Sequence, residues 1–316
     1  SILEEGIIHD DLWLTLHEST IDDAAKTVEI EMVSLVPPTV LQSREDETTQ
    51  KGTKELHHEH VRVQYQKPAT AFQHPNAGVM LTSLHWILNT LSKMETSTNK
   101  AATTEITTTR GISSTTKPRM LEMYCGCGAH TVPLAKSTLL SEIVAVELDG
   151  RLVNACRNNC RSNDCLEERV NRHSHADASE HPSTPDNNDG TSVQVFEGDA
   201  AEWAAKTLRR QLKIEKNKTG QSPSSSSKGD SNGYDYNNFD ILLVDPPRDG
   251  LSSTVCDMAM KGTFSHVIYV SCGRRALLRD LAILCDVGGF DVADLAVIDL
   301  FPGTDAVESL VHLKRR

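Results

Sequence analysis

The chain has 316 residues, enough for one large or two modest domains with a sizeable core. Its formal net charge of −12 argues against a generally basic surface, so we expect any contact with RNA to be local. No apolar run approaches the ~18 residues of a transmembrane helix, and no signal peptide pattern follows Ser1.

The eight cysteines have no spacing that predicts a disulfide framework. Cys156, Cys160 and Cys165 form a cluster, but no second Cys or His pair completes a tetrahedral metal site. We therefore expect buried, reduced thiols, no metal and no membrane contact. A cytoplasmic or nuclear location is expected, and an organelle also stays open because the N-terminus lacks Met.

Two segments near the N-terminus alternate apolar and polar residues, at 27–33 and 61–65, and predict β-strands. The segment 42–60 between them is charged and turn-like. We expect residues 1–70 to form a small β-rich accessory module. A polar loop at 71–78 and an apolar stripe that predicts a helix over 79–94 follow this module.

Three polar tracts lack hydrophobic periodicity and interrupt the remaining chain. They are rich in Ser, Thr, Asn or charged residues, a composition that cannot bury enough apolar surface to order a segment. We predict disordered insertions at 95–117, 171–191 and 214–238.

From residue 119 the order of elements predicts an α/β domain. A strand over 119–124 leads into a turn with Gly126 and Gly128, where glycine lets the backbone approach a ligand closely. The next strand ends at Glu147, 21 residues after Gly126, near the spacing at which an acid binds ribose hydroxyls. The GxGxxG of dinucleotide sites is absent, which favours a cofactor without a pyrophosphate, such as S-adenosylmethionine.

Two further strands lead into aspartates. Asp199 follows the strand at 193–196 and is placed either to accept from an adenine amino group or to cap the next helix. Asp245 follows the apolar strand at 239–244 and precedes two prolines, which fix a turn at the sheet edge where ligands bind. We expect Asp245 to face the site, with a helix cap as its alternative role.

Cys272 follows an apolar strand at 266–270 and precedes a predicted helix at 276–284. Arg274 and Arg275 lie beside it. Positive charge and a helix N-terminus both favour thiolate over thiol, so a reactive cysteine is predicted here. The alternative is a buried structural thiol.

The chain closes with two predicted strands at 290–300 and 307–313. Their short connector predicts an antiparallel hairpin. Glu308 shares one face of the second strand with Leu310 and His312. It is either a positioned base or a solvated side chain.

The motifs MYCGCG, AVELD, DPPRDGL, IYVSCG and DLFPGTDAVE occur in an order that resembles the S-adenosylmethionine-dependent RNA (uracil-5-)-methyltransferases, which modify uridine in tRNA or rRNA. The FQHPNAG stretch is similar to the segment before the catalytic domain of that family. The resemblance covers residues 71–316. It implies a Rossmann-like class I methyltransferase domain with a C-terminal antiparallel hairpin, preceded in residues 1–70 by a shortened RNA-contacting module.

The resemblance also implies roles for individual residues. Cys272 is implied to be the nucleophile and Glu308 the base. Cofactor contacts are implied for His74, Tyr124, Gly126, Gly128, Glu147, Asp199 and Asp245, and substrate contacts for Asp245, Arg248 and Arg274. Four positions differ from the family pattern: His74 replaces Gln, Ala129 replaces a polar residue, and Gly273-Arg274 replaces Asn-Pro.

The implied function is methylation of carbon 5 of a uridine in RNA by a monomer, with the T-loop of tRNA as the first target and rRNA as the second. An amino-group methyltransferase acting on nucleic acid also uses Asp-Pro-Pro-like turns but needs no cysteine. A non-catalytic RNA-binding relative is a further alternative. An RNA cytosine-5-methyltransferase is disfavoured, because a cysteine directly after the Asp-Pro-Pro strand would be expected there.

Overall fold

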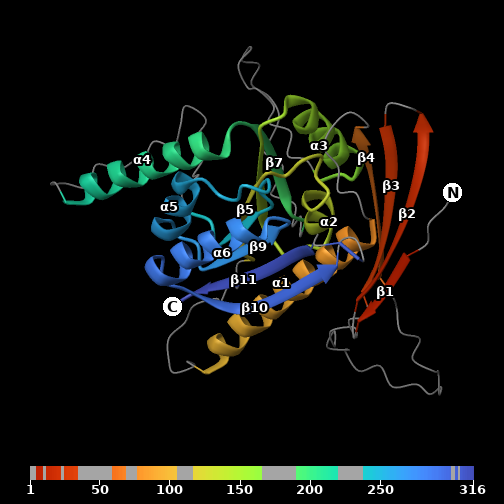
Figure 1. Ribbon diagram of the computed structural model, residues 1–316. Helices are drawn as coiled ribbons and strands as arrows, with labels where there is room; N and C mark the ends of the chain where they lie inside the picture. Colours follow the sequence, from red (N-terminus) through yellow and green to blue (C-terminus); the bar gives the residue numbers. More distant parts are fainter. Residues whose placement is uncertain are drawn as a thin grey trace, which may run out of the picture.

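The structure is a computed structural model, and it describes residues 5–9, 12–22, 25–34, 59–68, 77–104, 117–165, 190–219, 238–299, 303–304 and 307–316. The described strands form two sheets. One has four strands in the order β1-β2-β3-β4, and the other has seven in the order β10-β11-β9-β8-β5-β6-β7. Figure 1 shows the small sheet at the right, beside the helices α2 and α3 that flank the larger sheet.

The small sheet is antiparallel throughout. Its strands are β1 (Glu5–His9), β2 (Leu12–Asp22), β3 (Ala25–Ser34) and β4 (Glu59–Pro68). The predicted strands at 27–33 and 61–65 lie within β3 and β4. β1 and β2 were not predicted, although Leu12, Leu14 and Leu16 alternate with other residues in β2 as a half-buried strand requires.

The large sheet has a parallel centre and an antiparallel end. Its parallel strands are β5 (Arg119–Met123), β6 (Glu142–Glu147), β7 (Ser192–Glu197), β8 (Ile241–Val244) and β9 (His266–Ser271). The hairpin of β10 (Phe290–Asp299) and β11 (Val307–Arg315) is antiparallel, as predicted, and β11 pairs with β9. The chain starts in the middle at β5, moves out to β7 and returns to β8. The strand order thus reverses between β5 and β8, where an open α/β sheet binds its ligands.

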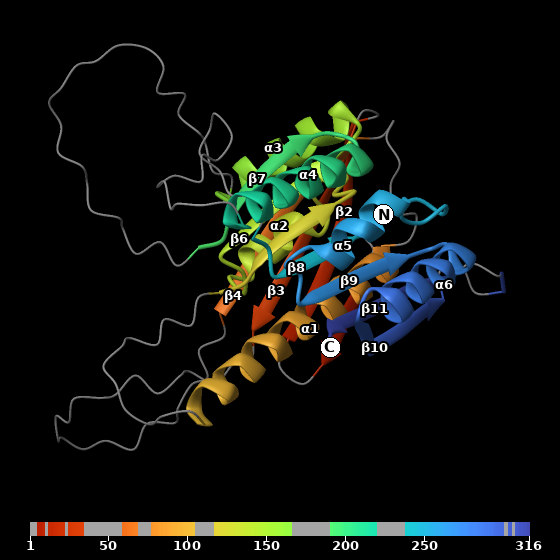
Figure 2. The same ribbon diagram turned by 90° about the vertical axis from the view of Figure 1, so that its left-hand side faces the viewer.

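Helices cover both faces of the large sheet, as Figure 2 shows from the side. One face carries α1 (Ala77–Thr104), α2 (Thr131–Lys136) and α3 (Gly150–Ser162). The other carries α4 (Ala200–Thr219), α5 (Ser253–Lys261), α6 (Arg274–Ala282) and the π-helix η1 (Ile283–Val287). Each face of the large sheet has its own hydrophobic core, and alternate residues of β9 contribute to the two. Ile268 and Val270 pack towards α1, and Val267 and Tyr269 pack towards α5 and α6. This is the expected Rossmann-like methyltransferase architecture.

Two helices are longer than predicted. α1 continues to Thr104, so the first ten residues of the tract 95–117 are helical, and α4 runs to Thr219, into the tract 214–238. Thr191, assigned to the second tract, is buried and donates to the Leu140 carbonyl at 2.7 Å. Composition failed here because Thr, Lys and Glu extend a helix that is already nucleated at modest cost. The rest of the three tracts lies almost entirely outside the described residues.

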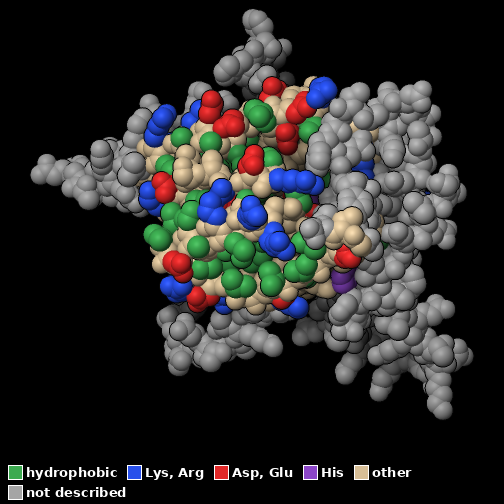
Figure 3. All heavy atoms as spheres, in the orientation of Figure 1, with side chains coloured by type: hydrophobic (Ala, Val, Ile, Leu, Met, Phe, Trp, Pro, Cys, Tyr) green, Lys and Arg blue, Asp and Glu red, His purple; other side chains and the backbone are tan. Residues whose placement is uncertain are grey.

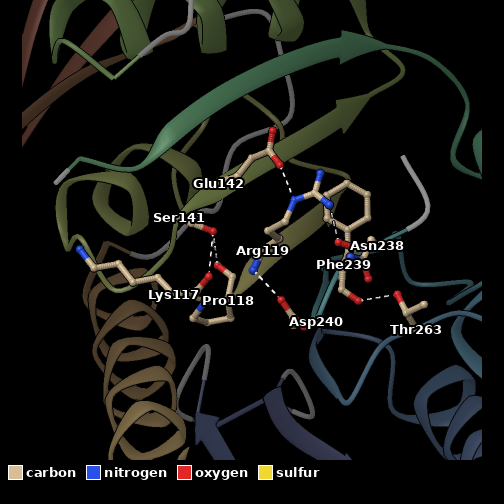
Figure 4. A network of polar contacts seen from close by, with 9 residues as sticks. All are labelled: Lys117, Pro118, Arg119, Ser141, Glu142, Asn238, Phe239, Asp240 and Thr263. Carbon is tan, nitrogen blue, oxygen red and sulfur yellow. Dashed lines mark hydrogen bonds and ion pairs between the residues drawn. The ribbon is translucent and has the colours of Figure 1, made fainter. Parts of the chain in front are cut away.

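The amino-terminal edge of the large sheet is held by Arg119 (Figure 4). Its Nε donates to Glu142 Oε2 at 2.6 Å, and its Nη1 donates to the Asn238 carbonyl at 2.6 Å. The guanidinium also lies over the Phe239 ring, 4.8 Å from its centroid. These contacts join the starts of β5, β6 and β8. Within the described part of the chain, no helix combines the length and apolar character needed to cross a membrane.

Candidate active site

The carboxyl-terminal edge of the large sheet gathers the polar residues that the sequence singled out. Tyr124, Asp245 and Cys272 directly follow β5, β8 and β9, and Glu147 is the last residue of β6. Because these strands are parallel, all four residues lie at one edge. β11 runs the other way, so its beginning brings Glu308 to the same edge.

Strand register places Glu308 beside Cys272. Ser309 pairs with Ser271 across the antiparallel β11 and β9. Glu308 precedes Ser309 and Cys272 follows Ser271, so both residues adjoin this last pair, and the Glu308 carboxylate acts electrostatically on the Cys272 thiol. Glu308 is 2% exposed, whereas Cys272 is partly exposed. The hairpin therefore delivers a buried carboxyl to the side of an accessible thiol.

The electrostatics of Cys272 differ from the prediction. Burial, followed by the nearby Glu308 and Asp245 carboxylates, raises the pKa of the Cys272 thiol, so thiolate is not favoured in the free protein. The opposing influence comes from Arg248, whose hydrogen bond and charge lower that pKa. Arg274 and Arg275, which were expected to do this, are exposed side chains in the first turn of α6. Their sequence neighbourhood was misleading because a side chain at a helix start can point away from the preceding residue.

A close backbone contact brings Arg248 to the thiol. A Cβ at Gly273 would collide with the Arg248 carbonyl oxygen, so only glycine allows the two turns to approach this closely. The turn after Asp245 is further held by the fully buried Asp280, whose Oδ2 accepts from the Leu251 N–H and the Tyr269 hydroxyl, both at 2.8 Å. The glycine that departs from the family pattern thus has a structural role.

The glycine turn after β5 is built as a cradle. Tyr124, Gly126 and Gly128 all have positive φ values, 65°, 58° and 89°, and such backbone strain in a non-glycine residue is concentrated at functional sites. The Gly126 N–H donates to Glu147 Oε2 at 3.0 Å. A Cβ at Gly128 would lie 2.9 Å from the Cys156 sulfur, so glycine is required there. The glycine turn and Glu147, the acid 21 residues after Gly126, are therefore in direct contact.

Glu147 and Asp199 both accept backbone hydrogen bonds. Glu147 Oε1 accepts from the Asp149 N–H at 2.9 Å. Asp199 Oδ1 accepts from the Glu202 N–H at 2.9 Å, so Asp199 caps α4, the alternative that its sequence left open. Asp199 also lies near Tyr124: burial first, and then the Asp199 charge, raise the pKa of the Tyr124 phenol to about 12. Each carboxylate has a second oxygen or further lone pairs that a ligand can use.

Two further residues of this edge were not predicted from the sequence. Glu122 is fully buried in β5 and accepts from the Thr131 hydroxyl at 2.7 Å, and burial raises the pKa of its carboxyl well above the usual range. Leu148 follows Glu147 and is 65% exposed, so it presents an apolar surface beside the Glu147 carboxylate. A charged residue in an otherwise apolar strand was the available signal for Glu122. His74, a predicted cofactor contact, lies outside the described residues.

Cys272 is one of two partly exposed cysteines, and it is the one at the carboxyl-terminal edge of the sheet. Six of the eight thiols are buried, including Cys156, Cys160 and Cys165, as the sequence predicted. Burial raises the pKa of Cys127 to about 12, and a hydrogen bond with Cys156, together with burial, raises that of Cys125. Cys285, the other partly exposed thiol, is on η1. Among the described residues, no group of three or more His, Cys, Asp or Glu side chains is arranged to hold a metal ion.

The fold is a Rossmann-like α/β sheet with polar residues gathered at its carboxyl-terminal edge, and several known proteins resemble this chain. A family model described as tRNA (Uracil-5-)-methyltransferase matches residues 230–316. A tRNA/tmRNA (uracil-C(5))-methyltransferase of Azotobacter vinelandii is 28% identical over 255 residues, which cover 81% of this chain and 52% of the relative. A 23S rRNA (uracil(1939)-C(5))-methyltransferase RlmD of Xanthomonas oryzae is 27% identical over 198 residues, which cover 63% of this chain and 33% of the relative.

This chain is therefore similar to RNA (uracil-C5)-methyltransferases that act on tRNA, tmRNA or 23S rRNA. The chain spans about half the length of the first of these relatives and about a third of the second. Among solved structures, the tRNA (uracil-54, C5)-methyltransferase of Pyrococcus abyssi in complex with S-adenosyl-L-homocysteine aligns with a TM-score of 0.45 and 18% identity, over 79% of this chain and 41% of that one.

Proposed function

We propose that this chain carries the catalytic domain of an enzyme that methylates carbon 5 of a uridine in RNA with S-adenosylmethionine. The single observation that carries the proposal is the grouping of Cys272, Glu308, Asp245 and Arg248 at one edge of the sheet. An accessible thiol, a buried carboxyl beside it and a guanidinium on it supply the nucleophile, base and anion stabiliser that this reaction requires.

The cofactor has a fitting cradle in the neighbouring strand ends. The positive-φ turn at Gly126 and Gly128 exposes backbone to a ligand, and Glu147 presents carboxylate oxygens for ribose hydroxyls. The exposed Leu148 side chain offers an apolar surface for a purine ring, and Asp199 follows the next strand. The cofactor would supply an electrophilic methyl group carried on a sulfonium.

The side chains of the site have separate tasks. Cys272 loses its proton to water and attacks carbon 6 of the uracil as a thiolate stabilised by Arg248, which makes carbon 5 nucleophilic towards the methyl group. Glu308 then removes the proton from carbon 5, and the bond between carbon 6 and the Cys272 sulfur breaks. Asp245 precedes two prolines that fix its turn, between the glycine turn and Cys272, and we assign to it the orientation of the uracil base.

The RNA must present its uridine unstacked, because such a pocket cannot reach a base inside a helix. The exposed Arg274 and Arg275 are available for phosphates near the site, while Arg248 contacts the thiol. Figure 3 shows Lys and Arg side chains gathered over the region where Figure 1 places α6 and β9. A local basic surface on a chain with a net charge of −12 agrees with a local RNA contact.

We propose tRNA as the first substrate class and rRNA as the second. The family model is described by tRNA, and the relative that aligns over the larger share of this chain is named for tRNA and tmRNA. Relatives named for 23S rRNA support the second candidate.

The test is transfer of an isotopically labelled methyl group from the cofactor to unmodified tRNA and rRNA transcripts, followed by nucleoside analysis. Label in 5-methyluridine, lost with Cys272→Ala, is the expected result. Label on an amino nitrogen of a base, or full activity of Cys272→Ala, would point to an amino-group methyltransferase. Cofactor binding without transfer to any RNA would point to a non-catalytic relative.

A further inference from the structure

Two asparagines join the N-terminal sheet to the helix behind the glycine turn. β4 is an outer strand of the small sheet, and one of its edges faces α3. Asn159 lies on α3 and Asn163 is the C-cap residue that follows it, and the two side chains are 3% and 7% exposed. Each side-chain amide pairs with one residue of the β4 backbone, as a neighbouring strand would. This pairing satisfies backbone groups that an outer strand otherwise leaves open.

The two amides make matching contacts with β4. Asn159 Oδ1 accepts from the Gln66 N–H at 2.9 Å, and its Nδ2 donates to the Gln66 carbonyl at 2.9 Å. Asn163 Oδ1 accepts from the Gln64 N–H at 3.1 Å, and its Nδ2 donates to the Gln64 carbonyl at 2.7 Å. Each asparagine therefore contributes two similar hydrogen bonds to the contact between β4 and α3.

The third hydrogen bond of each amide is different. Asn163 Nδ2 donates to the carbonyl of Asn159, on α3, at 2.7 Å. Asn159 Nδ2 donates to the carbonyl of Cys127 in the glycine turn, at 2.9 Å. The amide oxygen and both N–H groups of Asn159 thus form hydrogen bonds. Two of these bonds join β4, and the third joins the glycine turn.

The Cys127 carbonyl belongs to the same rigid peptide plane as the Gly128 N–H, which donates to the Cys125 carbonyl at 3.0 Å. Asn159 therefore fixes the orientation of this plane. The preceding part of the turn is held from the opposite side, because the Gly126 N–H donates to Glu147. The turn is fastened at both ends, by β6 through Glu147 and by α3 through Asn159.

We propose that Asn159 is a positioning residue for the cofactor turn and couples it to the edge of the N-terminal sheet. The small sheet then contributes to cofactor binding without touching the cofactor, because β4 holds the amide that orients the Cys127–Gly128 peptide. This inference rests on the proposed function, in which the glycine turn binds S-adenosylmethionine.

The experiment compares Asn159→Ala with the matched variant Asn163→Ala in the full chain. Calorimetry measures the Kd for S-adenosyl-L-homocysteine, and thermal unfolding measures Tm. Both variants lose two bonds to β4, so we expect similar decreases in Tm. We expect Asn159→Ala to raise the Kd about fivefold to tenfold and Asn163→Ala to change it less than about twofold. Equal effects of the two variants on the Kd would overturn the proposal.

Amide hydrogen exchange provides a readout that needs no ligand. Exchange of the Gly126 and Gly128 amides should accelerate in Asn159→Ala and stay at the parent rate in Asn163→Ala. If Asn159→Ala does not fold, Asn159→Ser, which keeps a polar group in the buried site, replaces it. A parent protein that fails to bind the ligand would contradict the proposed function, whereas unchanged exchange at Gly128 in the Asn159 variant would contradict this inference.

Discussion

The two ends of β6 both carry a glutamate, and the two residues have different surroundings. At the amino end, Glu142 is paired with the Arg119 guanidinium at 2.6 Å in a network that joins three strand starts (Figure 4). At the carboxyl end, Glu147 accepts from the backbone N–H groups of Gly126 and Asp149. Backbone donors orient a carboxylate without cancelling its charge, whereas a guanidinium neutralises it. We infer that the amino edge serves stability and the carboxyl edge serves binding.

The largest effect is expected from Glu308→Gln at the carboxyl edge. Loss of a positioned base typically lowers the rate by ~10²–10⁴. Because Glu308 acts after the methyl group has moved, the variant should still attack the base and transfer the methyl group, but release product slowly. A covalent complex between protein and ordinary uridine RNA should then accumulate on denaturing gels. Turnover at the parent rate without such a complex would assign the base to another group or to water.

The pair of glutamates on β6 tests the comparison directly. Glu147→Ala should weaken cofactor binding by about 1–3 kcal/mol, the usual loss for a hydrogen bond to a charged group. Glu142→Ala, on the same strand, should lower Tm because it removes the ion pair between Glu142 and Arg119, while the Kd for the cofactor stays at the parent value. Calorimetry and thermal unfolding of both variants separate the roles. Unchanged affinity in Glu147→Ala would remove this residue from the site.

A smaller effect is expected on the reactivity of Cys272. Since burial and the carboxylates of Glu308 and Asp245 raise the pKa of this thiol, while Arg248 lowers it, Asp245→Asn should shift the pKa down and Arg248→Ala should shift it up. The rate of alkylation by iodoacetamide, followed against pH at the Cys272 peptide, reports the thiolate fraction. Arg274→Ala is the matched control, because Arg274 is likewise exposed but is not among the groups that shift the pKa of Cys272. A larger shift in Arg274→Ala than in Arg248→Ala would restore the interpretation based on sequence neighbours.

The smallest effect concerns acid stability near the amino edge. His266, the first residue of β9, lies 2.9 Å from His312 between ring nitrogens. Burial, followed by the charge of His266, lowers the pKa of His312 to about 4. The unfolded chain binds protons first, so stability is complete above the ordinary pKa of 6.5 and is lost as the pH falls towards 4. We expect the free energy of unfolding to decrease steadily as the pH falls over this range. His312→Leu should remove most of this pH dependence in urea unfolding, and an unchanged slope would assign it to other groups.

Much of the large sheet was predictable because each strand ends in a local signal. The glycine turn, the acid at Glu147, the prolines after Asp245 and the hairpin before Glu308 are all encoded within a few residues. The small sheet was only half predicted: β1 and β2 were missed, although β2 carries the alternation that would have revealed it. Its pairing with α3 through Asn159 joins residues that are 93 positions apart, which no local pattern contains.

The surroundings of Cys272 were less predictable for the same reason. Arg248 reaches the thiol because Gly273 lets two separate turns meet, whereas Arg274 is adjacent in sequence and exposed. The sign of the pKa shift depends on Glu308 and Asp245, which come from other strands. Sequence therefore indicated which residues meet at this edge, but not the balance of their charges.

Trapping of a covalent complex tests the central role of Cys272 most directly. The protein is incubated with the cofactor and tRNA in which 5-fluorouridine replaces uridine. A fluorine at carbon 5 cannot be removed as a proton can, so the adduct should persist. We expect a slowly migrating complex on a denaturing gel, with the nucleotide attached to the Cys272 peptide, and no complex with Cys272→Ser. Attachment at Cys125 or Cys127, or a complex that persists in Cys272→Ser, would contradict the assignment of Cys272 as the nucleophile.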